Sequence, residues 1–455
     1  MNKNIKIMVL LSIFSFVGCK KFLNEKPSKN LVVASTLDDL QAVLDDGNGL
    51  NLGNYPGLLE ARTDDFYIGL GGFNRLTDTD RDVYLFKKES QPDALAILTS
   101  WTSTYKTIAI ANTVIDELEF VKDGTEPERA KIKGSALFHR ALGHFLLAQV
   151  FCDVYNQKNA AVSLGIPLKK SSDIDEPIVR SSIQQTYDFI IEDLKSAVSE
   201  LPEYAEYLTR PNKAAAYALL ARVYLSQSKY EEALVAAQNS LKYNRSLLDF
   251  NVLDGNAAFP IHAMNEETLF FAYARGTNFL HHNRECYVDS VLYQQYEERD
   301  LRKKMFFKNV KTDKYSFKGT YMGFASGSFF VGPTVSEVYL TIAECSVRLG
   351  LVKEARDCLN ALLVTRWEKG YFQAITENNL ELLLEIVIAE RRKELIMRGV
   401  RWTDLRRLNL DPKFKKNIVR KLEGDQNEYV LKANTTDFIY KIPRTVVSHA
   451  QIEQN

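Results

Sequence analysis

The chain has 455 residues, of which 45% are hydrophobic and 25% charged, so it has enough apolar material for a large folded core. Its 58 basic and 58 acidic residues balance. This balance excludes the strong positive field through which nucleic-acid-binding domains and polybasic segments act. Composition therefore predicts a folded, globular protein.

The N-terminus has the layout of a bacterial lipoprotein signal. Two lysines precede an apolar run over residues 7–17, which is too short to cross a bilayer as a helix. Cys19 follows this run after a single glycine, as in a lipobox, where the thiol receives diacylglycerol. We expect residues 1–18 to be removed and residues 19–34 to form a lipidated tether. An ordinary secreted protein is the alternative.

Two stretches predict antiparallel helix pairs in one register. Within residues 212–243, apolar anchors from Tyr217 to Tyr224 recur at helical spacing, and small alanines follow in the second helix. Residues 334–365 repeat the arrangement. The sequence therefore predicts a mostly α fold, a tetratricopeptide-like scaffold of helix pairs with long irregular insertions and a few short strands. Residues 380–408 are predicted to form one long charged helix.

The insertions are the expected ligand side. Residues 47–91 and 244–333 combine glycine with Tyr, Phe, Asn and Arg, which supply backbone freedom, flat stacking faces and hydrogen-bond partners. The three tryptophans lie in helical patterns, so we expect them in the core. The predicted ligand contacts are Phe73, Asn74, Arg81 and Tyr84 first, and Tyr287 and Tyr321 second.

One acidic stretch resembles a calcium-binding loop. Asp78, Asp80, Asp82 and Glu89 have the spacing of EF-hand ligands. However, Val83 stands where the loop needs a glycine, and a β-branched residue resists that sharp turn. We therefore expect a solvated acidic loop without a metal, and calcium is the alternative.

Neither catalysis nor disulfide bonding is predicted. The chain contains no H-E-x-x-H, G-x-S-x-G, Walker A or C-x-x-C motif, so no catalytic residue is assigned. Beyond Cys19 the cysteines are Cys152, Cys286, Cys345 and Cys358. Most lie in apolar helical patterns, which favours buried free thiols. Whether Cys345 and Cys358 are bridged stays open.

Several stretches together resemble one known family. They are FLNEKPSKN, WTSTYKTIAIANTVI, SSIQQTYDFIIEDLKSAVSELP, NKAAAYALLARVYL, AERRKELIMRGVRWTDLRRL and IPRTVVSHAQIEQN. With the lipobox, and in this order over nearly the whole chain, they resemble the SusD/RagB family of outer-membrane nutrient-binding lipoproteins. Arg398 departs from the family pattern, which usually has Glu there, and this puts one internal ion pair in doubt.

The resemblance implies a function. It implies one SusD-like domain over residues 35–455 with four helix pairs, lipid-anchored in the outer membrane and exposed at the cell surface. Such a protein would capture a nutrient, a glycan first and a peptide as the alternative. It would pass the nutrient to a SusC-like TonB-dependent transporter. The sequence also leaves open a helical-repeat module that binds proteins and, last, a glycan-degrading enzyme.

Overall fold

The computed structural model describes residues 35–89, 91–277, 285–324 and 327–455. Cys19 and the predicted tether lie outside these residues. In the described part, no helix is long and apolar enough to cross a membrane. The long helices are α6 (Leu95–Leu118), α7 (Glu126–Phe151), α8 (Ile183–Glu200), α9 (Lys213–Ser226), α10 (Tyr230–Tyr243), α13 (Val335–Arg348), α14 (Val352–Leu363) and α15 (Leu380–Glu394).

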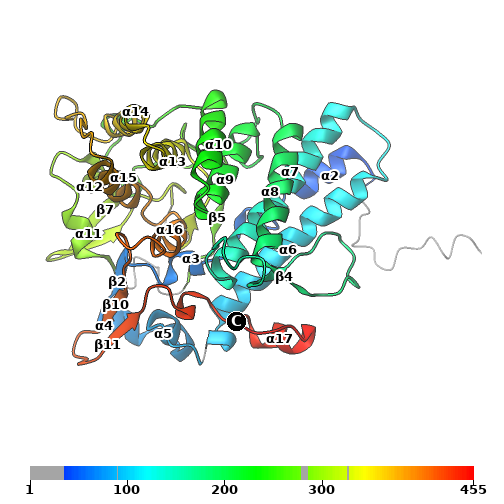
Figure 1. Ribbon diagram of the computed structural model, residues 1–455, viewed down its shortest axis with the longest axis horizontal. Helices are drawn as coiled ribbons and strands as arrows, with labels where there is room; N and C mark the ends of the chain where they lie inside the picture. The colour runs from blue at the N-terminus through cyan, green and yellow to red at the C-terminus, as the bar shows by residue number, and fades with distance from the viewer. Residues whose placement is uncertain (1–34, 90, 278–284, 325–326) are drawn as a thin grey trace, which may run out of the picture.

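These helices form a continuous array (Figure 1). Helices α6, α7 and α8 lie on one side, α13, α14 and α15 on the other, and the α9–α10 hairpin lies between them. Helix α10 packs directly on α13, although a long insertion separates them in the sequence. The two hairpins predicted from their register are thus neighbours. The mostly α, tetratricopeptide-like fold is confirmed.

Local sequence signals begin these helices. Ser182 and Gln185 form a reciprocal capping box at the start of α8, and Thr125 and Glu128 do so at α7. Asn212 caps α9. Within the α9–α10 hairpin, the buried Ser240 donates to the carbonyl oxygen of Ala214 at 2.8 Å.

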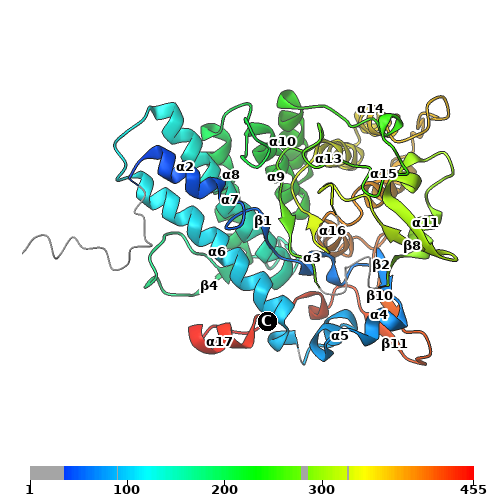
Figure 2. The same ribbon diagram turned by 180° about the vertical axis from the view of Figure 1, so that it is seen from behind.

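The shorter elements lie around the helix array, and several of them pack directly against α6, α7 and α8 (Figure 2). The helices are α2 (Leu37–Asp45), α3 (Leu58–Ala61), α4 (Leu70–Asn74), α5 (Asp78–Tyr84), α11 (Ser290–Gln294), α12 (Leu301–Phe306), α16 (Arg401–Leu408) and α17 (Arg444–Ala450), with 3-10 turns η2 (Gln91–Asp93), η3 (Phe250–Val252) and η5 (Thr436–Phe438). The strands are β1 (Leu52–Tyr55), β2 (Phe66–Ile68), β3 (Leu164–Pro167), β4 (Arg180–Ser182), β5 (Tyr273–Ala274), β6 (Cys286–Val288), β7 (Phe307–Lys311), β8 (Lys314–Phe317), β9 (Phe329–Phe330), β10 (Ile418–Lys421) and β11 (Glu428–Leu431).

The strands join the two segments that the sequence predicts to be irregular. Strand β1 pairs in parallel with β5, which pairs antiparallel with β9. Strand β2 pairs antiparallel with β6, placing Tyr67 opposite Tyr287. Residues 47–91 are therefore not an irregular loop, because they form two strands and three short helices. Through these pairings they lie against residues from the second segment.

The acidic stretch is also ordered differently from the prediction. Residues Asp78–Tyr84 form helix α5, and the Thr77 side chain caps it by accepting from the backbone amide of Asp80. The expected solvated loop is therefore wrong, and an EF-hand loop is absent here. Among the described residues, no group of three or more His, Cys, Asp or Glu side chains is arranged to hold a metal ion.

Residues 380–408 form two helices, not one. Gly399 has a φ of +69°, which lies in the left-handed region, and it separates α15 from α16. The turn lets Arg391 on α15 meet Asp404 on α16 at 2.8 Å. Arg401 instead pairs with Asp64, which the sequence pattern did not predict.

Arg398 is buried without an acidic partner among its described contacts. Its guanidinium carbon lies 3.7 Å from the centre of the Tyr321 ring, and its Nη2 donates to Thr334 Oγ1 at 2.8 Å. A cation–π contact and a hydrogen bond therefore stand where the family pattern suggests an ion pair. The four cysteines of the described chain, Cys152, Cys286, Cys345 and Cys358, are free thiols, as predicted.

Candidate ligand-binding site

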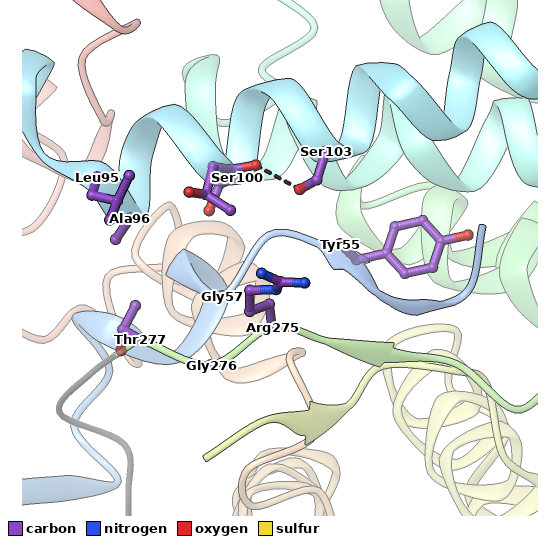
Figure 3. Close-up of a pocket in the computed structure, with 10 residues that line it drawn as sticks. Tyr55, Gly57, Leu95, Ala96, Ser100, Ser103, Arg275, Gly276 and Thr277 are labelled. Carbon is purple, nitrogen blue, oxygen red and sulfur yellow. Dashed lines mark hydrogen bonds between the residues drawn. The ribbon is translucent and has the colours of Figure 1, made fainter. Parts of the chain in front are cut away.

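A pocket lies where the two insertions meet the first half of α6 (Figure 3). Its volume is about 160 Å³. One wall is the end of β1 and the turn before α3, a second is α6, and the third is the chain that follows β5. The lining residues are Tyr55, Gly57, Leu95, Ala96, Thr99, Ser100, Ser103, Arg275, Gly276 and Thr277.

Two glycines allow the backbone segments around the pocket to approach closely. A Cβ atom on Gly57 would lie 2.0 Å from the carbonyl oxygen of Arg275. A Cβ atom on Gly276 would lie 1.2 Å from the carbonyl oxygen of Gly327. No side chain fits at either distance. The pocket wall therefore depends on glycine at both positions.

Helix α6 presents hydroxyl groups to the pocket. Thr99, Ser100 and Ser103 line it, and Ser103 Oγ donates to the carbonyl oxygen of Thr99 at 2.5 Å (Figure 3). At the rim, Leu95 is 70% exposed at the first residue of the helix. Hydroxyls beside an exposed apolar side chain suit a ligand with both polar and apolar faces.

The opposite wall supplies a cation and an unpaired hydroxyl. Arg275 is exposed, and its guanidinium points toward the face of α6 that carries Ser100 and Ser103 (Figure 3). Thr277 is only 4% exposed, and its Oγ1 has no hydrogen-bond partner within the described chain. A buried hydroxyl without a partner costs free energy. A ligand group that hydrogen-bonds to it would remove that cost.

The Tyr55 and His139 side chains are uncharged at neutral pH. Tyr55 is buried and its phenol oxygen lies 3.5 Å from His139 Nδ1. Burial raises the pKa of Tyr55 and lowers the pKa of His139 to about 4. Arg275 is the sole charged side chain among the described residues that line this pocket.

Two aromatic rings lie beside Arg275 in the fold. Tyr273, the first residue of β5, precedes it by two residues. Phe324 packs edge-on against Tyr273, with 6.0 Å between ring centres, and is 40% exposed. These rings do not line the pocket itself, but they supply apolar surface close to Arg275 in the chain.

The aromatic contacts predicted from the sequence are core residues. Phe73, Tyr84, Tyr287 and Tyr321 are 9%, 1%, 2% and 1% exposed. The phenol oxygen of Tyr84 accepts from the backbone amide of Ile68 at 2.9 Å. Tyr321 donates to Glu267 Oε2 at 3.0 Å. A buried ring has no free face for a ligand, so the stacking role predicted for these four rings is corrected.

The two polar candidates lie at the surface but do not line the pocket. Asn74 is exposed at the end of α4, and Arg81 is partly exposed on α5. Arg81 Nη2 donates to the carbonyl oxygen of Asn74 at 2.7 Å, and its Nη1 lies 3.2 Å from Asp78. Arg81 thus ties α5 to α4. A ligand contact by Asn74 or Arg81 stays a prediction.

Arg275, Thr277, Ser100 and Ser103 were missed by the sequence reasoning. One local signal existed, because residues 99–104 are nearly all Ser and Thr, which are poor formers of helix interiors. A core helix that carries such a run has a reason to expose hydroxyls. No local sequence pattern indicates that Arg275 lines a pocket, because the strand pairings of β5 bring it close to α6.

The helix array with a polar pocket at its flank defines a tetratricopeptide-like protein. Comparison with known families then identifies the family within this class. A family model described as starch-binding and associating with the outer membrane matches residues 21–225, and a model described as the SusD family matches residues 335–449. The chain belongs to the SusD/RagB-like family, whose members are associated with the outer membrane. The pocket residues Arg275–Thr277 lie between the two matched ranges.

Two individual relatives are also named as SusD-like proteins. The SusD-like protein P2 of Formosa agariphila is 25% identical over 372 residues, which cover 68% of this chain and 71% of that protein. A SusD-like protein of Bacteroides ovatus is 28% identical over 148 residues, which cover 32% of this chain and 25% of that protein.

Solved structures show the same fold. A SusD superfamily protein from Bacteroides thetaiotaomicron aligns with a TM-score of 0.75 at 24% identity, covering 92% of this chain and 99% of its own. A structure described as a putative sugar-binding protein from Bacteroides vulgatus aligns with a TM-score of 0.75 at 22% identity, covering 93% and 99%.

Proposed function

We propose that this protein is a non-catalytic outer-membrane lipoprotein that captures a glycan in the α6 pocket. It then passes the glycan to a SusC-like TonB-dependent transporter. The observation that carries the ligand class is the lining of the pocket, with three hydroxyl side chains of α6, the unpaired Thr277 hydroxyl and one cation. Membership of a family described as starch-binding supports the same class.

The surroundings of the pocket fit a sugar chain. Sugar hydroxyls both donate and accept hydrogen bonds, as the Ser and Thr hydroxyls do. Phe324, which is 40% exposed, and the partly buried Tyr273 offer ring surface that suits the apolar faces of pyranose rings. The volume of about 160 Å³ accommodates one end of a chain, whose remaining units would extend over these rings.

Glycan and peptide arrays would test the ligand class. We expect wild-type protein to bind oligosaccharides, and Arg275→Ala to weaken that binding about three- to tenfold, because one hydrogen-bonding contact to the ligand is lost. Arg299→Ala, which changes an exposed arginine outside the pocket, is the matched control and should bind like wild type. Binding of peptides but not oligosaccharides would favour the peptide alternative, and turnover of a glycan would contradict the non-catalytic role.

Membrane anchoring and the transporter need separate tests. Cys19→Ala should move the protein from the membrane fraction to the soluble fraction, because the acyl chains are attached to that thiol. Membrane association of this variant, with no acyl chain detectable on wild type, would contradict lipidation. Wild type should co-purify with a TonB-dependent transporter from detergent-solubilised outer membrane, and recovery of monomer alone would count against the partner.

A further inference from the structure

A second cavity, of about 250 Å³, lies between α15 and α16. Its walls are aliphatic and aromatic: Ile388 and Ala389 from α15, Leu405 and Leu408 from α16, and Phe414 from the following loop. Three cations, Arg392, Arg401 and Lys416, also line it, together with Gln295 and Glu385. The α6 pocket shares no lining residue with it.

The two guanidinium groups are held in fixed positions. Arg401 binds Asp64 through Nε at 2.8 Å and Nη2 at 3.0 Å. Arg392 donates from Nε to Asp65 Oδ1 at 2.9 Å and from Nη2 to the carbonyl oxygen of Asp64 at 2.8 Å. Burial alone would raise the pKa of Asp64, but Arg401, Arg392 and Lys416 outweigh it and hold that pKa well below its usual range. The carboxylate of Asp64 thus stays ionised and orients the cations.

Donors remain on these cations. Nη1 of Arg392 and Nη1 of Arg401 make no hydrogen bond to any described residue, and neither atom is sealed from solvent. Lys416 is half exposed and uses one of its three donors on Asp64, at 2.7 Å. The acid that lines the cavity, Glu385, pairs with Lys413 at 3.0 Å, and Lys413 also lies 3.6 Å from Glu381. The cavity therefore offers several free cationic donors beside an apolar wall.

The apolar surface continues outside the cavity. Leu382 is 48% exposed and lies on the same face of α15 as Glu385 and Ala389, by helical spacing. Leu410, two residues after Leu408, is 39% exposed. Phe414 is the one aromatic ring in the described lining, and the aliphatic side chains around it give no flat face for a sugar ring but pack well against aliphatic side chains of a polypeptide.

We propose that the α15–α16 cavity binds a polypeptide segment of a partner protein in which a carboxylate lies next to an aliphatic side chain. The aliphatic group fills the space between Ile388 and Leu405, and the carboxylate accepts from Arg392, Arg401 and Lys416. Guanidinium groups pre-oriented by Asp64 and Asp65 suit a carboxylate, because their planar donors match its two oxygens. The site is independent of glycan capture at the α6 pocket.

Small probes test this chemistry on the wild-type chain. Methyl NMR of the purified full-length protein, with the Ile388 signal assigned through Ile388→Val, would follow N-acetyl-L-leucine, N-acetyl-L-leucinamide and D-galacturonic acid. We expect the leucine probe to shift the Ile388 methyl signal with a Kd on the order of millimolar. The amide lacks the carboxylate and should bind at least about fivefold more weakly.

A pair of lysine variants locates the charge. Lys416→Gln should weaken binding of the leucine probe about two- to fivefold, as expected for a partly exposed ion pair. The matched control, Lys415→Gln, changes an exposed lysine that does not line the cavity and should leave binding unchanged. Equal binding of acid and amide, equal effects of the two variants, or no shift at about 50 mM probe would overturn the proposal. Tighter binding of galacturonic acid would overturn the polypeptide assignment in favour of an acidic saccharide.

Discussion

Glu60 on α3 is fully buried and lacks a salt bridge within the described chain. Its Oε1 accepts from the backbone amide of Gly399 at 2.7 Å, so this carboxyl joins α3 to the turn between α15 and α16. Burial, and then the nearby Asp65, raise the pKa of Glu60 to about 8. The side chain is therefore mostly neutral at pH 7, and we predict that its ionisation destabilises the fold.

The size and sign of the effect follow from linkage. The folded-state pKa of about 8 is above the ordinary value of 4.5. The stabilising effect of the neutral carboxyl is therefore fully present below pH 4.5 and is lost as the pH rises through about 8. At about 1.4 kcal/mol per pKa unit, the ionisation of Glu60 should lower the unfolding free energy by roughly 4 kcal/mol when the pH is raised from 5 to 8.

Glu60→Gln isolates this contribution. The amide oxygen keeps the acceptor for Gly399 and cannot ionise. In urea unfolding, variant and wild type should be similar at pH 5, and the variant should be more stable by several kcal/mol at pH 8. Other groups, such as the buried His139, titrate equally in both proteins and cancel in the difference. Glu89→Gln, at an exposed acid, is the control. If Glu60→Gln keeps the pH dependence of wild type, Glu60 is ionised in the folded protein and the reasoning fails.

Two further predictions concern the scaffold and the pocket. Arg222 links α9 to α13, because its Nε and Nη2 donate to the two carboxylate oxygens of Glu337 at 2.7 and 2.6 Å. Arg222→Met should lower the unfolding free energy by about 3 kcal/mol, because it removes this partner from a buried carboxylate. The double variant with Glu337→Leu should regain most of that loss, and no regain would contradict the pairing. Gly276→Ala should abolish oligosaccharide binding, because its Cβ would overlap the Gly327 carbonyl, and retained affinity with unchanged thermal stability would contradict the tight approach.

The hairpins could be predicted from the sequence because their helices depend on local spacing. Tyr217 to Tyr224 show a helical period, and Asn212 and Thr334 cap their helices through neighbouring amides. Helix α5 was missed because Asp and Thr are poor helix formers, although Thr77 provided a cap that the sequence shows.

The site could be predicted only as a region. The meeting of the two insertions with α6 does hold a pocket, but the chosen rings of Tyr84 and Tyr321 are core residues. Their burial depends on distant partners, since Arg420 lies 4.4 Å over the Tyr84 ring and Arg398 lies 3.7 Å over that of Tyr321. An aromatic residue in a glycine-rich segment has the same local sequence whether its ring faces solvent or the core.

The contact of α10 with α13 has a consequence for folding kinetics. The connection between these helices is roughly 90 residues long, and closing it costs about 3 kcal/mol more chain entropy than a four-residue turn would. Each hairpin can form from local contacts, whereas their mutual interface requires the ends of the insertion to meet. We therefore expect the two halves of the array to fold early and dock late. Until they dock, the face of α10 that packs on α13 is exposed and open to misassociation with other chains.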